Sequence, residues 1–163
     1  MESIAIVTTI GTYYDHIPQW AASIEALQRQ PDEIVIAASE PWRVWTTLEK
    51  ASASLPHTRV RSVDGDFLLS RFLNHAIAAT SSDWIAWIGV DDSYHPEALN
   101  GLDDLQADVL TYGMHIENRG TWRGGLLSDC RLYNPIPCGS PFRRWIWEAT
   151  LFQEHLFLSL IHI

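Results

Sequence analysis

Short apolar runs alternate with amphipathic segments along this chain, and the alternation restricts the fold more than any other feature. Apolar or alternating runs that suit strands lie at 3–9, 33–38, 58–63, 83–90 and 107–115. Helical spacing of apolar residues predicts helices over 17–27, 41–53, 69–77, 96–105 and 143–157. Because the connections between successive strands are too long for hairpins, we expect an α/β fold with a mainly parallel sheet and right-handed crossovers. Asn118-Arg119-Gly120 and Gly124-Gly125 predict a hairpin or a mobile loop late in the chain.

Length and charge narrow the class of protein. The chain has 163 residues with 47% apolar and 19% charged side chains, which predicts one globular unit with its own core. Its net charge of −9 repels a phosphate backbone, so we expect no nucleic-acid partner. No stretch approaches the ~18 apolar residues of a membrane span, and the N-terminus lacks the positive region of a signal peptide. A cytoplasmic protein is therefore expected, with Cys130 and Cys138 as reduced thiols.

Polar residues directly after the predicted strands are the candidate ligand contacts, because parallel sheets bind ligands outside the carboxyl ends of their strands. They are Thr8, Thr9, Ser39, Glu40, Asp64, Asp66, Asp91 and Asp92. Adjacent carboxylates repel unless a cation lies near them, and Mg²⁺ or Mn²⁺ suits carboxylate oxygens while leaving positions open for a diphosphate. The alternative is that Asp92 or Ser93 caps the next helix while Asp91 is only solvated. For Asp64 and Asp66, the alternative is an Asp-Gly turn.

The segment SRFLNHAIAATSSDWIAWIGVDDSYHPEAL, residues 70–99, resembles the central signature of family 2 glycosyltransferases. It has Asn74 on an amphipathic helix, an aromatic-rich strand at 84–88, then Asp91-Asp92 and Tyr94-His95-Pro96. The opening strand SIAIVTT, the helix that ends at Gln30-Pro31 and the strand EIVIAAS are similar to the family's first βαβ unit. The resemblance implies a GT-A fold over residues 1–155, which is a Rossmann-like three-layer sandwich with a mainly parallel central sheet.

The resemblance also implies a reaction and its site residues. The reaction is the metal-assisted, inverting transfer of a sugar from a nucleoside-diphosphate sugar to the hydroxyl of an unidentified acceptor. Asp91 is then the main ligand of Mn²⁺ or Mg²⁺ and Asp92 supports it, while Gly89 stands where the family motif has its first acid. The implied nucleotide-binding residues are Thr8, Thr9, Ser39, Glu40, Arg71 and Asn74. For Thr9, Arg71 and Asn74, the alternatives are strand packing, a solvated cation and a structural amide.

The family uses a late acid as the general base, and the resemblance implies Glu154, with Glu148 in reserve. Their alternative is a pair of solvent-facing helix acids. The apolar tail at 156–163 is expected to be a truncated or non-native end that promotes self-association. Trp122, Trp145 and Trp147 are candidates for stacking on sugars, with core packing as the alternative.

Two other functions stay open at this point. One is a noncatalytic nucleotide-binding or sugar-binding module, which retained affinity without turnover would identify. The other is a nucleotidyltransferase, which also uses acids and a metal on diphosphates. The loop TIGTYYD after the first strand has one glycine and no Lys or Arg, so the glycine-rich basic loop expected of a nucleotidyltransferase is missing there.

Overall fold

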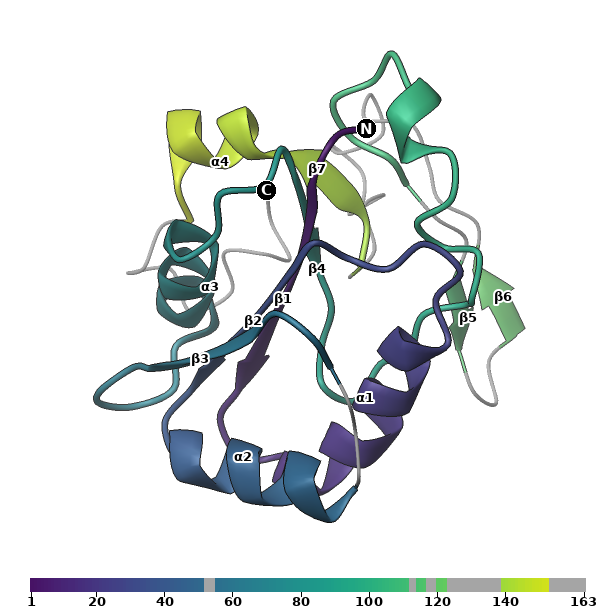
Figure 1. The fold of residues 1–163 in the computed structure, drawn as a ribbon. Coiled ribbons are helices and arrows are strands. Elements are labelled where there is room, and N and C mark those ends of the chain that lie inside the picture. The colour runs from purple at the N-terminus through teal and green to yellow at the C-terminus, as the bar shows by residue number, and fades with distance from the viewer. Residues whose placement is uncertain (52–54, 112–113, 117–119, 123–138, 153–163) are drawn as a thin grey trace.

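The central element of the fold is a five-stranded sheet with the order β3-β2-β1-β4-β7 (Figure 1). The computed structural model describes residues 1–51, 55–111, 114–116, 120–122 and 139–152. The sheet contains β1 (Ile4–Ile10), β2 (Glu33–Ala38), β3 (Thr58–Ser62), β4 (Trp84–Trp87) and β7 (Pro141–Arg143). The first four strands are parallel and β7 is antiparallel to β4, which confirms the predicted α/β fold with a mainly parallel sheet.

Helices cover both faces of the sheet and give three layers (Figure 1). The helices are α1 (Ile17–Glu25), α2 (Pro41–Lys50), α3 (Leu69–Ala78) and α4 (Arg144–Thr150). Side chains alternate along β1, so Ile4 and Ile6 pack with α1 and α2 while Ala5 and Val7 pack with α3. All seven residues of β1 are buried, as its continuous apolar sequence predicts for a strand covered on both faces. None of the described helices has the length and hydrophobicity needed to cross a bilayer.

The predicted helix over 96–105 is wrong. The structure has turns there, followed by the short 3₁₀ helix η2 (Leu102–Asp104). Gly101 has φ +78°, a left-handed conformation that interrupts a helix. Leu99 and Leu102 are nonetheless buried, so the helical spacing reflected a buried face and not a regular helix.

The later part of the chain also departs from the predicted elements. In the described part of the predicted strand at 107–115, the structure has a bridge from Val109 to Phe142 and the start of β5 (Met114–Ile116). The predicted hairpin is confirmed, since β5 pairs antiparallel with β6 (Gly120–Trp122) beside the main sheet (Figure 1). Strand β7 was not predicted, because it is three residues long and includes a proline, which suits only a sheet edge. Helix α4 ends at Thr150, seven residues before the predicted boundary at 157, and Leu151 follows with φ +49°.

The amino ends of the strands are fixed by paired charges. Arg143 lies 2.6 Å from a carboxylate oxygen of Glu2 and stacks 4.1 Å from the ring centroid of the buried Trp84. Hydrogen bonds from Arg143 and the Trp84 indole hold the pKa of Glu2 below its ordinary value. The backbone N–H and hydroxyl of Ser3 donate to Asp83 at 2.9 and 2.8 Å, which lowers the pKa of Asp83. The carboxylates of Glu2 and Asp83 therefore stabilise the fold at this end of the sheet.

Candidate functional site

Because β1 to β4 are parallel, their carboxyl ends lie along one edge of the sheet, called the carboxyl edge here. In Figure 1, this edge lies where the arrowhead of β1 points, at the opposite end from α4. Hydrogen bonds extend the sheet past the strand ends, from Val63 N to Ala38 O at 3.1 Å and from Ile88 N to Val7 O at 3.1 Å. The loops that follow the strands are thereby brought together.

The loop after β4, residues 88–94, carries the adjacent acids Asp91 and Asp92 and is called the acidic loop here. A turn closes there, with Asp92 N donating to Gly89 O at 3.1 Å. Both carboxylates fold back over the turn: a Cβ added at Gly89 would lie 2.8 Å from Asp91 Oδ1 and 3.2 Å from Asp92 Oδ2. Two acidic groups therefore approach one point on the backbone, at the end of a buried strand.

Some acids at the two ends of the sheet differ in their partners. Those at the amino end hold Arg or Ser side chains, as Glu2 and Asp83 do. For the carboxylates of Asp64, Asp66 and Asp91, the described residues provide neither a hydrogen bond nor an ion pair. Carboxylates that have no partner among the described residues can take a cation.

The composition of this acidic loop suits a metal that is shared with a ligand. Among the described residues, no group of three or more His, Cys, Asp or Glu side chains could hold a metal. Two carboxylates supply hard oxygen ligands and leave most of an octahedral shell open, which matches Mg²⁺ or Mn²⁺ bound together with a diphosphate. The donor set does not suit zinc, which prefers a shell of His and Cys ligands.

The two threonines near the end of β1, Thr8 and Thr9, are buried. Thr8 is fully buried, and its hydroxyl donates to Ile88 O at 3.0 Å. The Thr8 hydroxyl therefore binds the start of the acidic loop, and a contact between Thr8 and a nucleotide stays a prediction. Thr9 is 7% exposed and lies in the part of β1 that ends at the carboxyl edge. Its role at a nucleotide stays a prediction.

After β2, the chain is held by a cluster around Tyr14, in the short 3₁₀ helix η1 (Tyr14–His16). The backbone N–H of Glu40 donates to the Tyr14 hydroxyl at 3.1 Å, and burial raises the pKa of this hydroxyl. Arg43 lies 2.8 Å from the Glu40 carboxylate and 4.1 Å from the centroid of the Tyr14 ring. Ser39 and Glu40 thus lie at the carboxyl edge as predicted, and the Glu40 carboxylate has a partner there.

Arg71, in the first turns of α3, reaches the loop after β3. Its guanidinium donates to the carbonyl of Asp66 and lies 3.3 Å from where a Cβ would stand on Gly65, which has φ +83°. Its buried Nε has no hydrogen-bond partner within the described part of the chain. Arg71 therefore fixes this loop and brings a positive charge to the carboxyl edge.

Asn74 joins two distant parts of the chain on the α3 side of the sheet. Its Oδ1 accepts from Trp147 Nε1 at 2.9 Å and from Phe152 N at 3.0 Å, and its Nδ2 donates to Phe152 O at 2.8 Å. The structural alternative for Asn74 is thus observed, while a contact with a nucleotide stays a prediction. Trp147 packs with the core on this face, which is the packing alternative for that tryptophan.

Replacing Asn74 with alanine should destabilise the protein by about 2 kcal/mol, because it leaves the polar groups of Trp147 and Phe152 without partners. Urea unfolding measures this loss, and hydrogen exchange at the Phe152 amide should speed up more than at strand amides. The matched control is Asn100→Ala, whose side chain makes an exposed 2.8 Å hydrogen bond with Gln28. Equal stabilities of the two variants would contradict the expected result.

The candidate base Glu148 lies far from the acidic loop. It pairs with Arg144 at 2.7 Å on α4, and Arg144 also donates to Thr80 O and Thr80 Oγ1 at the amino end of the sheet. The structure therefore does not bring Glu148 together with Asp91 and Asp92. Glu154, the tail at 156–163, Cys130 and Cys138 lie outside the described residues. Trp145 is exposed and Trp122 belongs to β6, so stacking by these two stays a prediction.

Two contacts near the carboxyl edge were not predicted from the sequence. The hydroxyl of Tyr94 donates to Gly139 O at 2.9 Å and joins the acidic loop to the residues before β7. Phe67 lies against Gly11, where a Cβ would be 2.7 Å from the Phe67 ring, and it packs edge-on to Phe72. The aromatic residue in Tyr94-His95-Pro96 was noted in the sequence, but a partner 45 positions away leaves no local signal.

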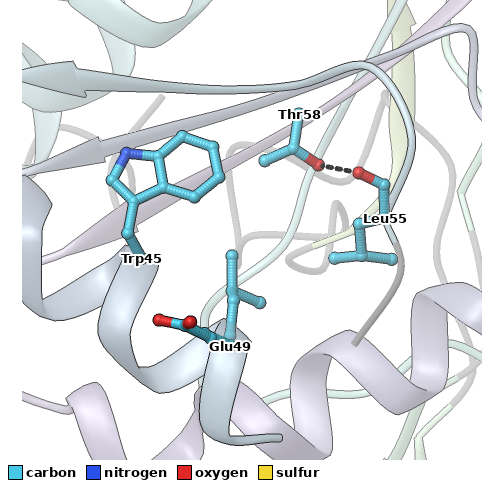
Figure 2. Close-up of a pocket in the computed structure, with 5 residues that line it drawn as sticks. Trp45, Glu49, Leu55 and Thr58 are labelled. Atoms are coloured by element: carbon cyan, nitrogen blue, oxygen red, sulfur yellow. Dashed lines mark hydrogen bonds between the residues drawn. The ribbon is translucent and has the colours of Figure 1, made fainter. Parts of the chain in front are cut away.

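A hollow between α2 and β3 lies away from these residues (Figure 2). Trp45, Leu48, Glu49, Leu55 and Thr58 line it, and the Thr58 hydroxyl donates to Leu55 O at 2.9 Å. Thr58 begins β3, so the hollow is at the amino end of that strand. It is separate from the carboxyl edge.

A comparison of the sequence with models of protein families agrees with the α/β fold described above. A model of the family described as glycosyl transferase family 2 matches residues 6–149, most of the chain. A comparison with curated protein sequences finds no match.

Solved glycosyltransferase structures have the same fold. S. aureus TarS 1-349 has a TM-score of 0.71 and 14% sequence identity, with 94% of this chain and 51% of that chain covered. Its complex with UDP has a TM-score of 0.71 and 14% identity, covering 97% and 53%. The mannosyltransferase PcManGT from Pyrobaculum calidifontis, in complex with GDP-Man and Mn²⁺, has a TM-score of 0.70 and 13% identity, covering 95% and 48%. These likenesses confirm the GT-A fold, and the chain spans about half the length of these three structures.

Proposed function

Because the chain belongs to glycosyl transferase family 2, we propose that it transfers a sugar from a nucleoside-diphosphate sugar to an acceptor hydroxyl, with inversion. The observation that carries the proposal is the convergence of the Asp91 and Asp92 carboxylates over Gly89 at the carboxyl edge. The Asp91 carboxylate has no partner among the described residues, so it is free to take a metal that a diphosphate shares. Neighbouring structures with UDP and with GDP-Man and Mn²⁺ support this class of donor.

The residues around the acidic loop support a division of roles. Asp91, with help from Asp92, would hold Mn²⁺ or Mg²⁺, which when bound neutralises the charge that develops on the departing diphosphate. Thr8 holds Ile88, so the loop that carries the acids starts from a fixed point. Arg71 holds the loop after β3 through the Asp66 carbonyl and supplies a cation toward the nucleotide. Thr9, Ser39 and Glu40 complete the proposed nucleotide-binding edge.

The base in this proposal is Glu154, which would take the proton from the acceptor hydroxyl as that oxygen attacks the anomeric carbon. The path of the chain supports this choice over Glu148. Helix α4 begins at the amino end of the sheet, where Arg144 binds Thr80, and the chain then turns back so that Phe152 lies beside Asn74. Glu154 follows Phe152 by two positions in the sequence, whereas Glu148 is held on α4 by Arg144.

Thermal unfolding with a panel of nucleoside diphosphates and nucleotide sugars tests the function directly. A ligand that binds only the folded state at 100 times its Kd adds about 2.7 kcal/mol, which raises the Tm by roughly 5–10 °C in a chain of this size. We expect such a rise for one base in Mn²⁺ or Mg²⁺, and a much smaller one in EDTA. The absence of any shift in a folded sample would contradict the proposal. A shift without sugar transfer to water or any acceptor would indicate a binding module.

A further inference from the structure

Phe67, in the loop that follows β3, is a half-exposed aromatic residue held in a fixed position at the carboxyl edge. The residue is 41% exposed, although a phenylalanine ring has no polar atom that gains from contact with water. We propose that the base of the nucleotide stacks on the Phe67 ring. The inference rests on the proposed function, because it names the residue that binds one part of the nucleoside-diphosphate donor.

The Phe67 ring packs against the chain just after β1, at Gly11. A Cβ at position 11 would lie 2.7 Å from Phe67 Cγ and 2.9 Å from Phe67 Cδ2, which is closer than real Cβ contacts come. Gly11 does not have a positive φ, so the space at this position requires a glycine and the backbone conformation does not. The contact joins the loop after β3 to the loop after β1, although β2 lies between these two strands.

Two further contacts fix the ring and the backbone that carries it. The Phe67 ring packs edge-on to Phe72, with 4.8 Å between the centroids, and Phe72 is fully buried on α3. The Arg71 guanidinium donates to the carbonyl of Asp66, the residue directly before Phe67. A ring held in this way loses little freedom when a ligand covers its exposed surface, which favours binding.

The order of the strands places this ring at a suitable distance from the acidic loop. In the order β3-β2-β1-β4, the loop of Phe67 follows one edge strand and the acidic loop follows β4. Three strand spacings separate the two loops, which is roughly 14 Å along the carboxyl edge. The contact with Gly11 brings the ring toward β1 and shortens this distance. A nucleoside diphosphate with its phosphates at the acidic loop could therefore extend its base to Phe67.

The chemistry of the ring favours a base over a sugar as its ligand. A phenylalanine side chain offers no hydrogen bond, so it cannot satisfy the hydroxyls of a sugar. Stacking needs only two flat surfaces, and every base has a flat face. In this inference Phe67 supplies affinity for any base, while polar groups at the same edge, such as Ser39 and Glu40, would select among the bases.

The test measures the affinities of Phe67→Leu and Phe67→Tyr for UDP, GDP and inorganic pyrophosphate by isothermal titration calorimetry in Mn²⁺. Leucine keeps an apolar side chain against Gly11 and Phe72 but has no flat ring, whereas tyrosine keeps the ring. We expect Phe67→Leu to bind the nucleotide that the wild type prefers about tenfold more weakly. Phe67→Tyr should bind it within twofold of the wild type. Pyrophosphate has no base, so its affinity should stay within twofold in both variants.

Trp45→Leu and Tyr13→Leu are the controls, and both should match the wild type. Trp45 is 48% exposed and lines the hollow at the amino end of β3, so its removal takes away an exposed ring that is not at the carboxyl edge. Tyr13 is 60% exposed in the loop after β1, where its ring packs edge-on to His16. A loss of nucleotide affinity in Tyr13→Leu with none in Phe67→Leu would assign the stacking to Tyr13 and overturn the inference.

The remaining outcomes separate the role of Phe67 from the proposed function. Unchanged nucleotide affinity in a folded Phe67→Leu protein would overturn the role of Phe67 and leave the proposed function standing. Equal losses for the nucleotide and for pyrophosphate would show that Phe67 only holds the loop. Nuclear Overhauser effects from the base protons to the Phe67 ring, measured in the wild type with Mg²⁺, test the contact without a variant, and their absence would contradict it. If the wild type binds no nucleoside diphosphate, the proposed function fails first.

Discussion

Replacing Asp91 with alanine should remove the metal-dependent part of nucleotide binding while the protein stays folded. The side chain is exposed at the end of β4, so the core loses nothing, and the described residues give its carboxylate no partner. Loss of a main ligand should weaken the affinity for the nucleoside diphosphate in Mn²⁺ by at least about 100-fold, to the level measured in EDTA. Isothermal titration calorimetry in Mn²⁺ and in EDTA, with Tm measured in parallel, checks this result.

The matched control for Asp91 is Asp104→Ala. Asp104 is an exposed acid in η2, and its carboxylate has no partner among the described residues. The variant lowers the net negative charge by the same amount, so it separates a local ligand effect from a general change in attraction for cations. Equal affinities of Asp91→Ala and wild type in Mn²⁺ would refute the metal assignment.

Replacing Glu154 with glutamine should lower kcat by about 10²–10⁴-fold with little change in KM, because the amide cannot accept the proton of the acceptor. The acid limb of the pH–rate profile should disappear in the same variant, since this limb reports protonation of the base. Steady-state kinetics across pH, with the donor identified by thermal unfolding, measures both effects.

Glu148→Gln is the matched control for Glu154. It changes the same functional group on α4, where Glu148 binds Arg144 at 2.7 Å. An exposed i,i+4 ion pair contributes little stability, so this variant should retain wild-type kcat and a similar Tm. A large loss of kcat in Glu148→Gln with none in Glu154→Gln would reverse the assignment of the base.

Periodicity predicted the part of the fold that lies in long, regular segments. The runs at 33–38 and 58–63 match β2 and β3 closely because each strand is bounded by turn residues and pairs with a neighbour along its length. Periodicity was misleading at Leu99 and Leu102. Their spacing fits a helix and both side chains are buried, but Gly101 between them has φ +78°, which a helix does not allow. A short edge strand such as β7 is defined by pairing with β4, which no local pattern reports.

The candidate site was predictable where it follows from topology and not where it follows from contacts. Asp91 and Asp92 lie where the carboxyl ends of parallel strands place them. The direction of the Thr8 hydroxyl, by contrast, depends on Ile88, 80 positions later. Asn74 likewise binds Phe152, 78 positions later. The sequence therefore offered a structural role for Asn74 as an alternative but could not identify its partner.

The hydrogen bond between Tyr94 and Gly139 also bears on how the chain could be re-engineered. It joins two residues 45 positions apart, one in the loop that follows β4 and one just before β7, the strand that pairs with β4. Doubling the length of the segment between them costs only about 0.6 kcal/mol of closure entropy. Because Leu99 and Leu102 are buried and Val109 forms a bridge with Phe142, a segment of another length or composition can replace the intervening one only if it keeps these residues.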